Sequence, residues 1–189
     1  MHRFSSSLFA SLLITATIGL LVTAPAGSPS WTNVSAQNAP RPAAGDRLFL
    51  KIDGVEGEAA EADHAGDVVL QSFNWSQTRG TDSSSKVQMK EFRVTMWADK
   101  AMPILMRKTA ARERIAKVTL AVRNQLGQDY VKWTLSDAFI TAFSIEDTAG
   151  NPRPKVTLDF TSPKIDVEYR AQLNTGGLGP AVKAGWDAR

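Results

Sequence analysis

The stretch KVTLDFTSPKIDVEYR, residues 155–170, decides the fold class. Apolar and polar side chains alternate along it with a period of two, which is typical of a β-strand with one buried face and one solvent-facing face. The apolar members are Val156, Leu158, Phe160, Ile165, Val167 and Tyr169. Proline is tolerated in sheets at edges and bulges, so Pro163 predicts two strands that form one long, bent ribbon.

The same alternation recurs along the chain on both sides of this ribbon. It predicts further strands, each with apolar residues that share one face: Leu48, Leu50 and Ile52; Val69, Phe73 and Trp75; Val87 and Met89; Phe92, Val94 and Met96; Val118, Leu120 and Val122; and Val131, Trp133, Leu135, Phe139, Phe143 and Ile145. A last short strand carries Val182 and Trp186. The apolar phase slips by one residue around Lys90–Glu91, which predicts a β-bulge there.

One segment has helical periodicity instead. Apolar and small side chains occupy positions i, i+3, i+4, i+7 and i+8, namely Met102, Leu105, Met106, Thr109 and Ala110. Together these patterns predict a mainly β fold, an antiparallel β-barrel of about seven to eight strands with one α-helix. We expect a single barrel domain over residues 47–189.

Residues 1–36 have the pattern of an export signal. Arg3 is the only charged residue there, and it precedes an apolar run that is shorter than the roughly 20 residues of a membrane span. Cleavage fits after Ala26 or after Ala36, and the second site is favoured. We expect residues 1–36 to be a signal peptide and residues 37–46 a flexible leader. The mature protein is then periplasmic or secreted without stable membrane insertion, and an uncleaved anchor is the alternative.

The composition excludes much of ordinary active-site chemistry. The chain has no cysteine and two histidines, so disulfides, thiolate nucleophiles and cysteine-ligated metals are excluded. Its 22 basic and 19 acidic residues form no long run of one sign, which argues against nucleic-acid binding. No hydrolase, zinc-protease, P-loop or dinucleotide-binding motif occurs. We therefore expect no catalytic residue, no cofactor and no metal.

A polar loop after the first strand holds the remaining chemistry-bearing side chains. His64 is the one histidine outside the export signal, and a solvated or interface role is favoured over catalysis. The acidic residues of the loop are Asp53, Glu56, Glu58, Glu61, Asp63 and Asp67. Clustered carboxylates can bind calcium, but EF-hand spacing is absent, so an acidic surface is favoured. Trp75 and Trp133 share the phase of their apolar neighbours, which predicts core packing rather than a stacking platform.

Several short motifs follow one another in order along the chain. They are LFLKIDGVEGE (48–58), His64-Ala65-Gly66, SFNW (72–75), FRVT (92–95), Asp99-Lys100-Ala101 with Pro103 and Leu105, AKVTL (116–120), Val167-Glu168-Tyr169 and Gly185-Trp186-Asp187. This ordered set covers residues 46–187 and resembles the Hcp family, the tube proteins of type VI secretion systems. No single motif is diagnostic; the order and spacing of the set carry the resemblance.

The resemblance implies a non-enzymatic structural protein whose barrel subunits assemble into hexameric rings. In the family, rings stack into a tube that carries effectors, so the implied partners are further copies of this chain, secretion-system components and effectors. The loop that reaches a neighbouring ring corresponds to residues 53–66. Its candidate ring-stacking residues are Asp53, Val55, Glu56, Glu58, Asp63 and His64. A head-to-tail ring also needs two different, complementary sides on each subunit.

Three features depart from the family's pattern. Met102 stands where many members place a serine before the helix proline, which removes an N-cap worth about 1 kcal/mol. The loop is acidic and rich in alanine where the family's loop is often lysine-bearing. An export signal is unexpected for a subunit that assembles in the cytoplasm. The alternative hypothesis is an exported, monomeric β-barrel binding module that has lost ring assembly, and a hydrolase using the loop carboxylates ranks last.

Overall fold

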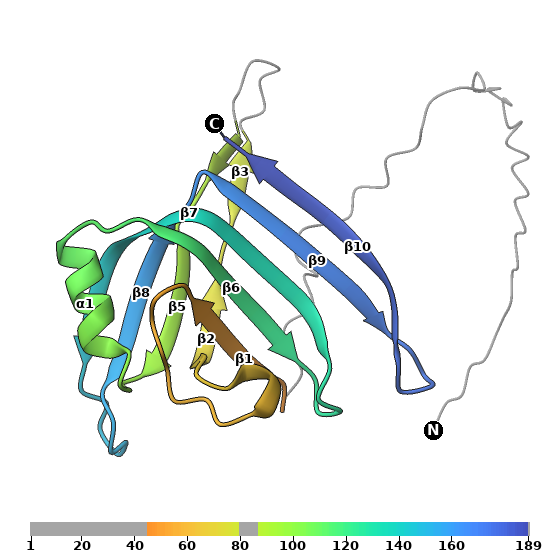
Figure 1. Ribbon diagram of the computed structural model, residues 1–189, viewed down its shortest axis with the longest axis horizontal. Helices are drawn as coiled ribbons and strands as arrows, with labels where there is room; N and C mark the ends of the chain where they lie inside the picture. The colour runs from red at the N-terminus through yellow and green to blue at the C-terminus, as the bar shows by residue number, and fades with distance from the viewer. Residues whose placement is uncertain (1–44, 80–86, 189) are drawn as a thin grey trace, which may run out of the picture. The chain divides into compact units, whose positions relative to one another are not determined.

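The computed structural model describes residues 45–79 and 87–188 (Figure 1). The predicted signal peptide and most of the predicted leader lie outside these residues. The described elements are β1 (Arg47–Ile52), η2 (Ala62–His64, a 3-10 turn), β2 (Val68–Asn74), β3 (Gln77–Arg79), β4 (Val87–Met89), β5 (Phe92–Trp97), α1 (Met102–Ala110), β6 (Ile115–Arg123), β7 (Asp129–Glu146), β8 (Lys155–Thr161), β9 (Lys164–Gln172) and β10 (Leu178–Asp187). Within this part of the chain, the prediction of a mainly β fold with one α-helix is confirmed.

Six antiparallel strands close into a barrel. Their order is β7-β6-β1-β2-β5-β8, and β8 pairs with β7 to complete the ring of strands. β9 and β10 continue the same sheet outside the closed part, which brings the sheet to eight strands. Figure 1 shows the β9–β10 ribbon (blue) extending to one side of the barrel. The short β3–β4 pair forms a separate two-stranded sheet.

The predicted bend at Pro163 is confirmed and explains how the barrel closes. β8 and β9 pair one after the other with the single long strand β7, through the partners Thr161–Phe139 and Lys164–Ser136. Ser162 lies buried at the bend, with its hydroxyl 2.6 Å from the Ser136 carbonyl oxygen. The ribbon therefore belongs to the barrel before the bend and leaves it afterwards.

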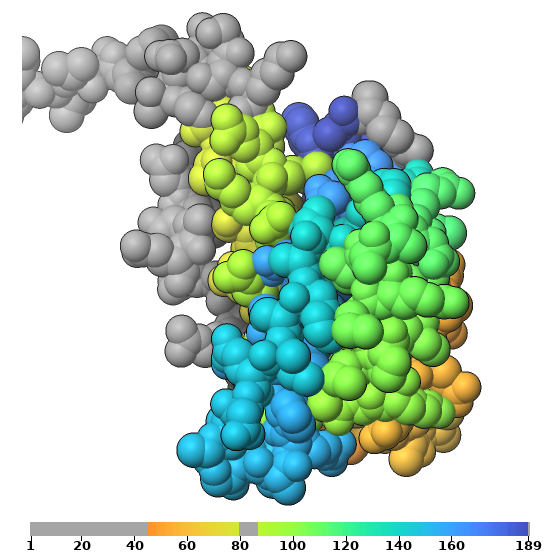
Figure 2. All heavy atoms as spheres, turned by 90° about the vertical axis from the view of Figure 1, so that its left-hand side faces the viewer, coloured from red at the N-terminus to blue at the C-terminus, as the bar shows by residue number. Residues whose placement is uncertain are grey.

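The core fills the interior of the barrel. Its most completely buried side chains include Leu50, Val68, Phe92, Val94, Met96, Leu105, Ile115, Leu120, Leu135, Leu158 and Phe160. Trp75 and Trp133 pack against this cluster with ring centroids 5.1 Å apart, so their predicted core role is confirmed. Figure 2 shows α1 (green) against one side of the barrel, beside the β7–β8 connection (cyan).

The buried face of α1 differs from the apolar stripe predicted for it. The buried positions are Ala101, Leu105 and Lys108, whereas Met106 is 56% exposed and Ala110 is also exposed. Lys108 buries its aliphatic stem and keeps its ammonium group 2.5 Å from the Glu113 carboxylate, which is how a long cation is accommodated at a buried position. Met106 and Ala110 belong to the predicted apolar stripe but do not face the sheet.

The start of α1 replaces the missing cap in another way. The Asp99 carboxylate accepts a hydrogen bond from the Ala101 N–H at 2.9 Å, and the Asp99 carbonyl oxygen accepts one from the Met102 N–H at 3.1 Å. Two of the donors at the helix start are thus satisfied without a serine at position 102. No helix of the described residues is long and apolar enough to cross a membrane.

Strand β2 changes phase where the sequence was interpreted as regular. Val68 and Leu70 face the core, and Val69 is exposed, contrary to the prediction. The pairing of β2 with β5 shifts between Leu70 and Ser72, so Phe73 returns to the core side. A one-residue shift in pairing moves the following side chains to the opposite face of the sheet.

Strand β7 changes phase twice. Ala138 and Ile140 are buried in place of the predicted Phe139 and Ile145, and Ile145 is exposed. The first change follows Asp137, whose φ of 57° is in the left-handed region, and the second is a pairing shift after Ile140.

The phase slip at Lys90–Glu91 is a break between two strands and not a bulge. β4 ends before it and β5 begins after it, and the Lys90 N–H donates to the Ser76 carbonyl oxygen at 2.9 Å. The last strand is also longer than predicted, because pairing with β9 begins at Leu178.

Candidate functional site

The predicted stacking loop is a folded segment, which we call the acidic loop (residues 53–67). The Gly57 N–H donates to the Gly66 carbonyl oxygen at 2.7 Å, and the Gly66 N–H donates to the Ala59 carbonyl oxygen at 3.0 Å. The Ala59 N–H donates to the Asp67 carbonyl oxygen at 2.9 Å. The two arms of the loop are therefore joined by backbone hydrogen bonds, and Gly57 and Ala59 are buried between them.

Gly57 lies where the two arms approach most closely. A Cβ atom on Gly57 would lie 2.7 Å from the Asp67 carbonyl carbon and from the Val68 Cα. We expect Gly57→Ala to lower the free energy of unfolding by about 2 kcal/mol, because only backbone movement relieves the overlap. Gly177→Ala is the matched control, since a Cβ there meets nothing within 4 Å. Equal urea midpoints for the two variants would contradict the close approach.

The first half of the acidic loop is tied to the start of α1. The Glu56 carboxylate lies 2.6 Å from the Lys100 ammonium group, and Glu58 accepts a hydrogen bond from the Lys100 N–H at 3.0 Å. Glu58 also lies 3.7 Å from the Arg153 guanidinium group in the β7–β8 connection. Asp53 and Val55 form the turn that leads into the loop, where the Val55 N–H donates to the Ile52 carbonyl oxygen at 3.0 Å. A cavity of about 730 Å³ opens beside this half of the loop.

The second half of the acidic loop is tied to the C-terminal end of β6 and to the start of β7. Asp63 lies 2.5 Å from the Arg123 guanidinium group, which also approaches Glu61 and Asp129 at 3.5 Å each. The structure thus separates the predicted stacking residues into two groups. Glu56 and Glu58 lie at α1, whereas Asp63 and His64 lie at β6 and β7.

His64 is buried, so the solvated position, one of its two predicted roles, is wrong, and the interface role stays a prediction. The ring is 7% exposed and stacks on Phe49 with centroids 4.2 Å apart and planes 3° apart. Its Nδ1 lies 2.9 Å from Asp67 Oδ2 and its Nε2 lies 3.1 Å from Asp129 Oδ1. Both ring nitrogens are thus engaged by carboxylates, which leaves neither to activate a nucleophile.

Asp129 and Arg123 are functional candidates that the sequence did not identify. They lie more than fifty residues along the chain from the acidic loop, and no local pattern marks them. Among the described residues, no group of three or more His, Cys, Asp or Glu side chains is arranged to hold a metal ion.

The carboxylates of the acidic loop make the fold sensitive to acid. The hydrogen bond from Arg123 lowers the pKa of Asp63, and the hydrogen bond from Lys100 lowers the pKa of Glu56. A lowered pKa in the folded state contributes stability above the ordinary value of about 4, and this contribution is lost as the pH falls through the lowered value. We expect Asp63→Asn to lower the melting temperature at neutral pH and to have a progressively smaller effect as the pH falls below about 4. Asp53→Asn, in the same loop but without an ion pair to the described residues, should have little effect at either pH; a pH-independent effect of Asp63→Asn would contradict this explanation.

The β9–β10 ribbon carries an apolar face that the described residues leave partly uncovered. Cross-strand partners place six apolar side chains on one side of the ribbon, which we call the ribbon face: Ile165, Val167, Tyr169, Val182, Ala184 and Trp186. The same rows continue into β7 through Val131, Trp133 and Leu135, which pack on the core. Toward its outer edge the ribbon face becomes exposed, and Val182 is 68% exposed.

The opposite side of the ribbon is charged, whereas a groove at one end continues the apolar surface of the ribbon face. The other side of the ribbon carries charged residues in pairs, such as Lys183 with Glu168 at 3.0 Å. At one end, beside Trp186, the ribbon face runs into a groove of about 490 Å³ whose lining includes Met89, Phe139 and Pro163. The apolar surface therefore extends from β10 toward β4.

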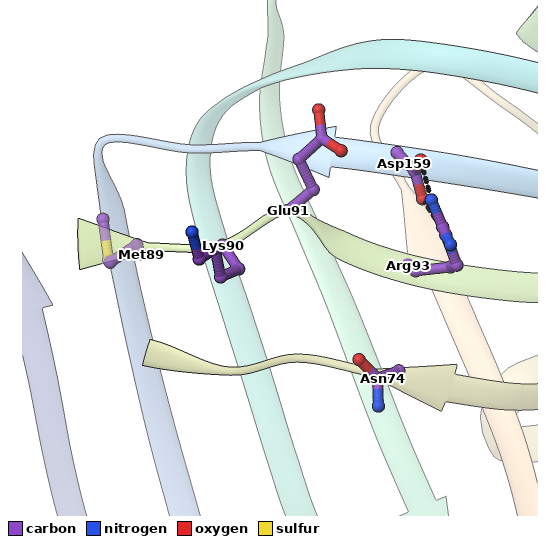
Figure 3. Close-up of a pocket in the computed structure, with 6 residues that line it drawn as sticks. All are labelled: Asn74, Met89, Lys90, Glu91, Arg93 and Asp159. Atoms are coloured by element: carbon purple, nitrogen blue, oxygen red, sulfur yellow. Dashed lines mark hydrogen bonds and ion pairs between the residues drawn. The ribbon is translucent and has the colours of Figure 1, made fainter. Parts of the chain in front are cut away.

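A third pocket lies beside the ion pair of Arg93 and Asp159 (Figure 3). Its volume is about 370 Å³, and it lies between the ends of β2 and β5 and strand β8. Figure 3 shows Arg93 and Asp159 paired at one side of it, with the Arg93 nitrogens 2.6 and 2.7 Å from the carboxylate oxygens. Asp159 is buried, and its bonds to Arg93 raise the pKa of the arginine. This pair links β5 to β8 within the barrel and serves the fold.

Comparison with known proteins agrees with this architecture. A family model described as "Type VI secretion system effector, Hcp" matches residues 49–169. A solved type six secretion system protein is 22% identical with a TM-score of 0.70, covering 75% of this chain and 94% of that chain. Hcp1 from Salmonella typhimurium is 25% identical with a TM-score of 0.67, covering 76% of this chain and 95% of that chain.

A type VI secretion system effector from Yersinia pestis is 24% identical with a TM-score of 0.63, and the match covers 74% of this chain and 98% of that chain. A search of curated proteins gave no match. The family match spans well over half of the sequence, runs from within β1 to within β9, and includes the acidic loop. On this evidence, the chain belongs to the Hcp family of type VI secretion system proteins.

Proposed function

We propose that this protein is a non-enzymatic structural subunit that assembles into hexameric rings through the ribbon face. The observation that carries the proposal is the exposed apolar surface of β9 and β10, centred on Val182 and Tyr169. Contiguous apolar patches on a soluble surface mark interaction sites, and a sheet normally has at least one face covered. Membership of the Hcp family supports further copies of this chain as the partner.

A closed ring with more than two subunits requires a head-to-tail contact. The ribbon face of one subunit then meets a different surface on the next, and the same contact repeats until the ring closes. The ribbon projects to one side of the barrel, which suits this arrangement, because a lateral projection can overlap a neighbour without blocking its own barrel (Figure 1).

We place ring stacking at the acidic loop. Of the six candidate residues, Glu56 and Asp63 have mostly exposed side chains that can reach a second ring, whereas His64 is buried and acts by positioning the others. The export signal predicted for residues 1–36 places the mature protein in the periplasm or outside the cell. Its further partners are then secretion-system components and effectors.

Light scattering coupled to size-exclusion chromatography tests the ring directly. The full chain is expected to elute with roughly six times the monomer mass, and negative-stain microscopy should show closed rings. A monomer at every concentration would refute ring assembly and favour the exported binding module. N-terminal sequencing of the exported protein tests the signal peptide, with Gln37 expected as the first residue and Gly27 as the alternative.

A further inference from the structure

We propose that His64 is held as a doubly protonated imidazolium between Asp67 and Asp129, and that this cation latches the acidic loop onto β7. His64 is then the positioning residue of the loop. The inference about the loop stands on its own contacts, and only its consequence for ring stacking rests on the proposed function.

The hydrogen-bond partners determine the protonation state. Asp67 Oδ2 lies 2.9 Å from one ring nitrogen and Asp129 Oδ1 lies 3.1 Å from the other. An ionised carboxylate only accepts hydrogen bonds, whereas a neutral imidazole offers one N–H and one lone pair. Both contacts are therefore hydrogen bonds only when both ring nitrogens carry protons. Removing one proton places a nitrogen lone pair against a carboxylate oxygen.

Packing prevents the His64 ring from turning away from the two carboxylates. The imidazole lies parallel to Phe49, and little of the side chain reaches solvent. A buried polar group without its hydrogen bond is destabilising, and water has limited access to replace either carboxylate. A change in the charge of His64 must therefore be met by movement of the segment that carries it.

The charges around His64 balance when the ring is a cation. The connected network contains four carboxylates and three other cations: Glu61, Asp63, Asp67, Asp129, Arg47, Arg123 and Lys132. A protonated His64 brings the cations to four and makes the network neutral. A neutral His64 leaves one uncompensated negative charge in a partly buried cluster, which is unfavourable.

The contact with Asp129 is the one that crosses between elements. His64 lies in η2 within the acidic loop, and Asp67 belongs to the same loop, whereas Asp129 begins β7. The second bridge in this region, from Asp63 to Arg123, joins the same part of the loop to β6. Loss of the proton on His64 removes the tie to β7 and is expected to loosen this end of the loop, which keeps its bridge from Asp63 to Arg123, while the ties of Glu56 to Lys100 remain.

Two measurements on the full chain test the latch together. Histidine ¹⁵N NMR from about pH 5 to about pH 8, the range in which histidine changes charge, reads the protons on both ring nitrogens. Hydrogen exchange at the same pH values, expressed as protection factors, reads the amides of Gly57, Ala59 and Gly66. We expect loop protection to fall at least about tenfold in the same pH step in which His64 loses its second proton. Protection that persists after that step, or a neutral ring beside a protonated carboxyl group, would overturn the proposal.

Asp129→Asn is the matched variant. An asparagine amide at this position can donate to an unprotonated ring nitrogen or accept from a protonated one, so the loop should stay protected without a pH step. If the variant instead keeps the wild-type pH step, Asp129 is not the latch. Microscopy of the rings over the same pH range separates the two proposals: loop release with unchanged stacks preserves the latch and refutes the stacking role.

Discussion

Replacing Val182 with aspartate is expected to leave the protein monomeric, with a roughly sixfold loss of mass relative to the assembled wild type. Val182 is the most exposed of the large apolar side chains of the ribbon face, and a ring would bury it against a neighbouring subunit. An unpaired carboxylate in an apolar interface is strongly unfavourable because it loses its hydration. Light scattering at several concentrations measures the effect.

Ala181→Asp is the control for the Val182 substitution. It adds the same charge one residue earlier, on the charged side of the ribbon, where Ala181 pairs across the strands with Arg170. This variant should assemble as the wild type does. If both variants assemble normally, the ribbon face is not the ring interface, and if both become monomeric, the effect is one of charge rather than of the apolar face. Circular dichroism confirms that each variant keeps its barrel.

Truncating Leu158 to alanine is expected to lower the free energy of unfolding by about 3 kcal/mol. Leu158 is fully buried, and its strand pairs on both sides, with Val94 of β5 and Phe143 of β7. The cavity would therefore lie where the barrel closes, between two strands that are held together through β8. For a chain of this length, the expected fall in melting temperature is about 6–12 °C.

Thr157→Ala tests whether the effect belongs to the core. Thr157 is the preceding residue of β8 and its side chain is half-buried on the other face of the sheet. Its loss should change the free energy of unfolding by less than about 1 kcal/mol. Equal effects of the two substitutions in urea unfolding would show that Leu158 does not occupy the centre of the core.

Regular alternation in the sequence was sufficient to predict the barrel strands that contain no irregularity. The clearest case is β8, where Val156, Leu158 and Phe160 face the core as predicted and the bend at Pro163 follows, whereas Tyr169 in β9 is exposed. The pattern failed at β2 and β7, because a shift in pairing with a neighbouring strand changes which residues face the core. Such a shift depends on the partner strand and leaves no mark in the local sequence.

For the helix and the acidic loop, the sequence located the element but did not predict which partners its side chains contact. Periodicity located α1, but the buried position was given to Lys108 and not to Met106, because the aliphatic stem of a lysine can serve as an apolar group when its charge finds Glu113. The loop could be recognised as acidic, yet its partners come from β6, β7 and α1.

The mainly β class, the single helix, the position of the acidic loop and the resemblance to the Hcp family could all be predicted from the residues alone, and the family match confirms the resemblance. These properties follow from local periodicity and the order of short motifs, which are visible along one chain. Three features are visible only in the folded chain: six strands close into a barrel, β9 and β10 carry a partly exposed apolar face, and His64 lies buried between Asp67 and Asp129. The reason is that closure, exposure and ion pairing all depend on residues that are far apart in the chain and meet only when it folds.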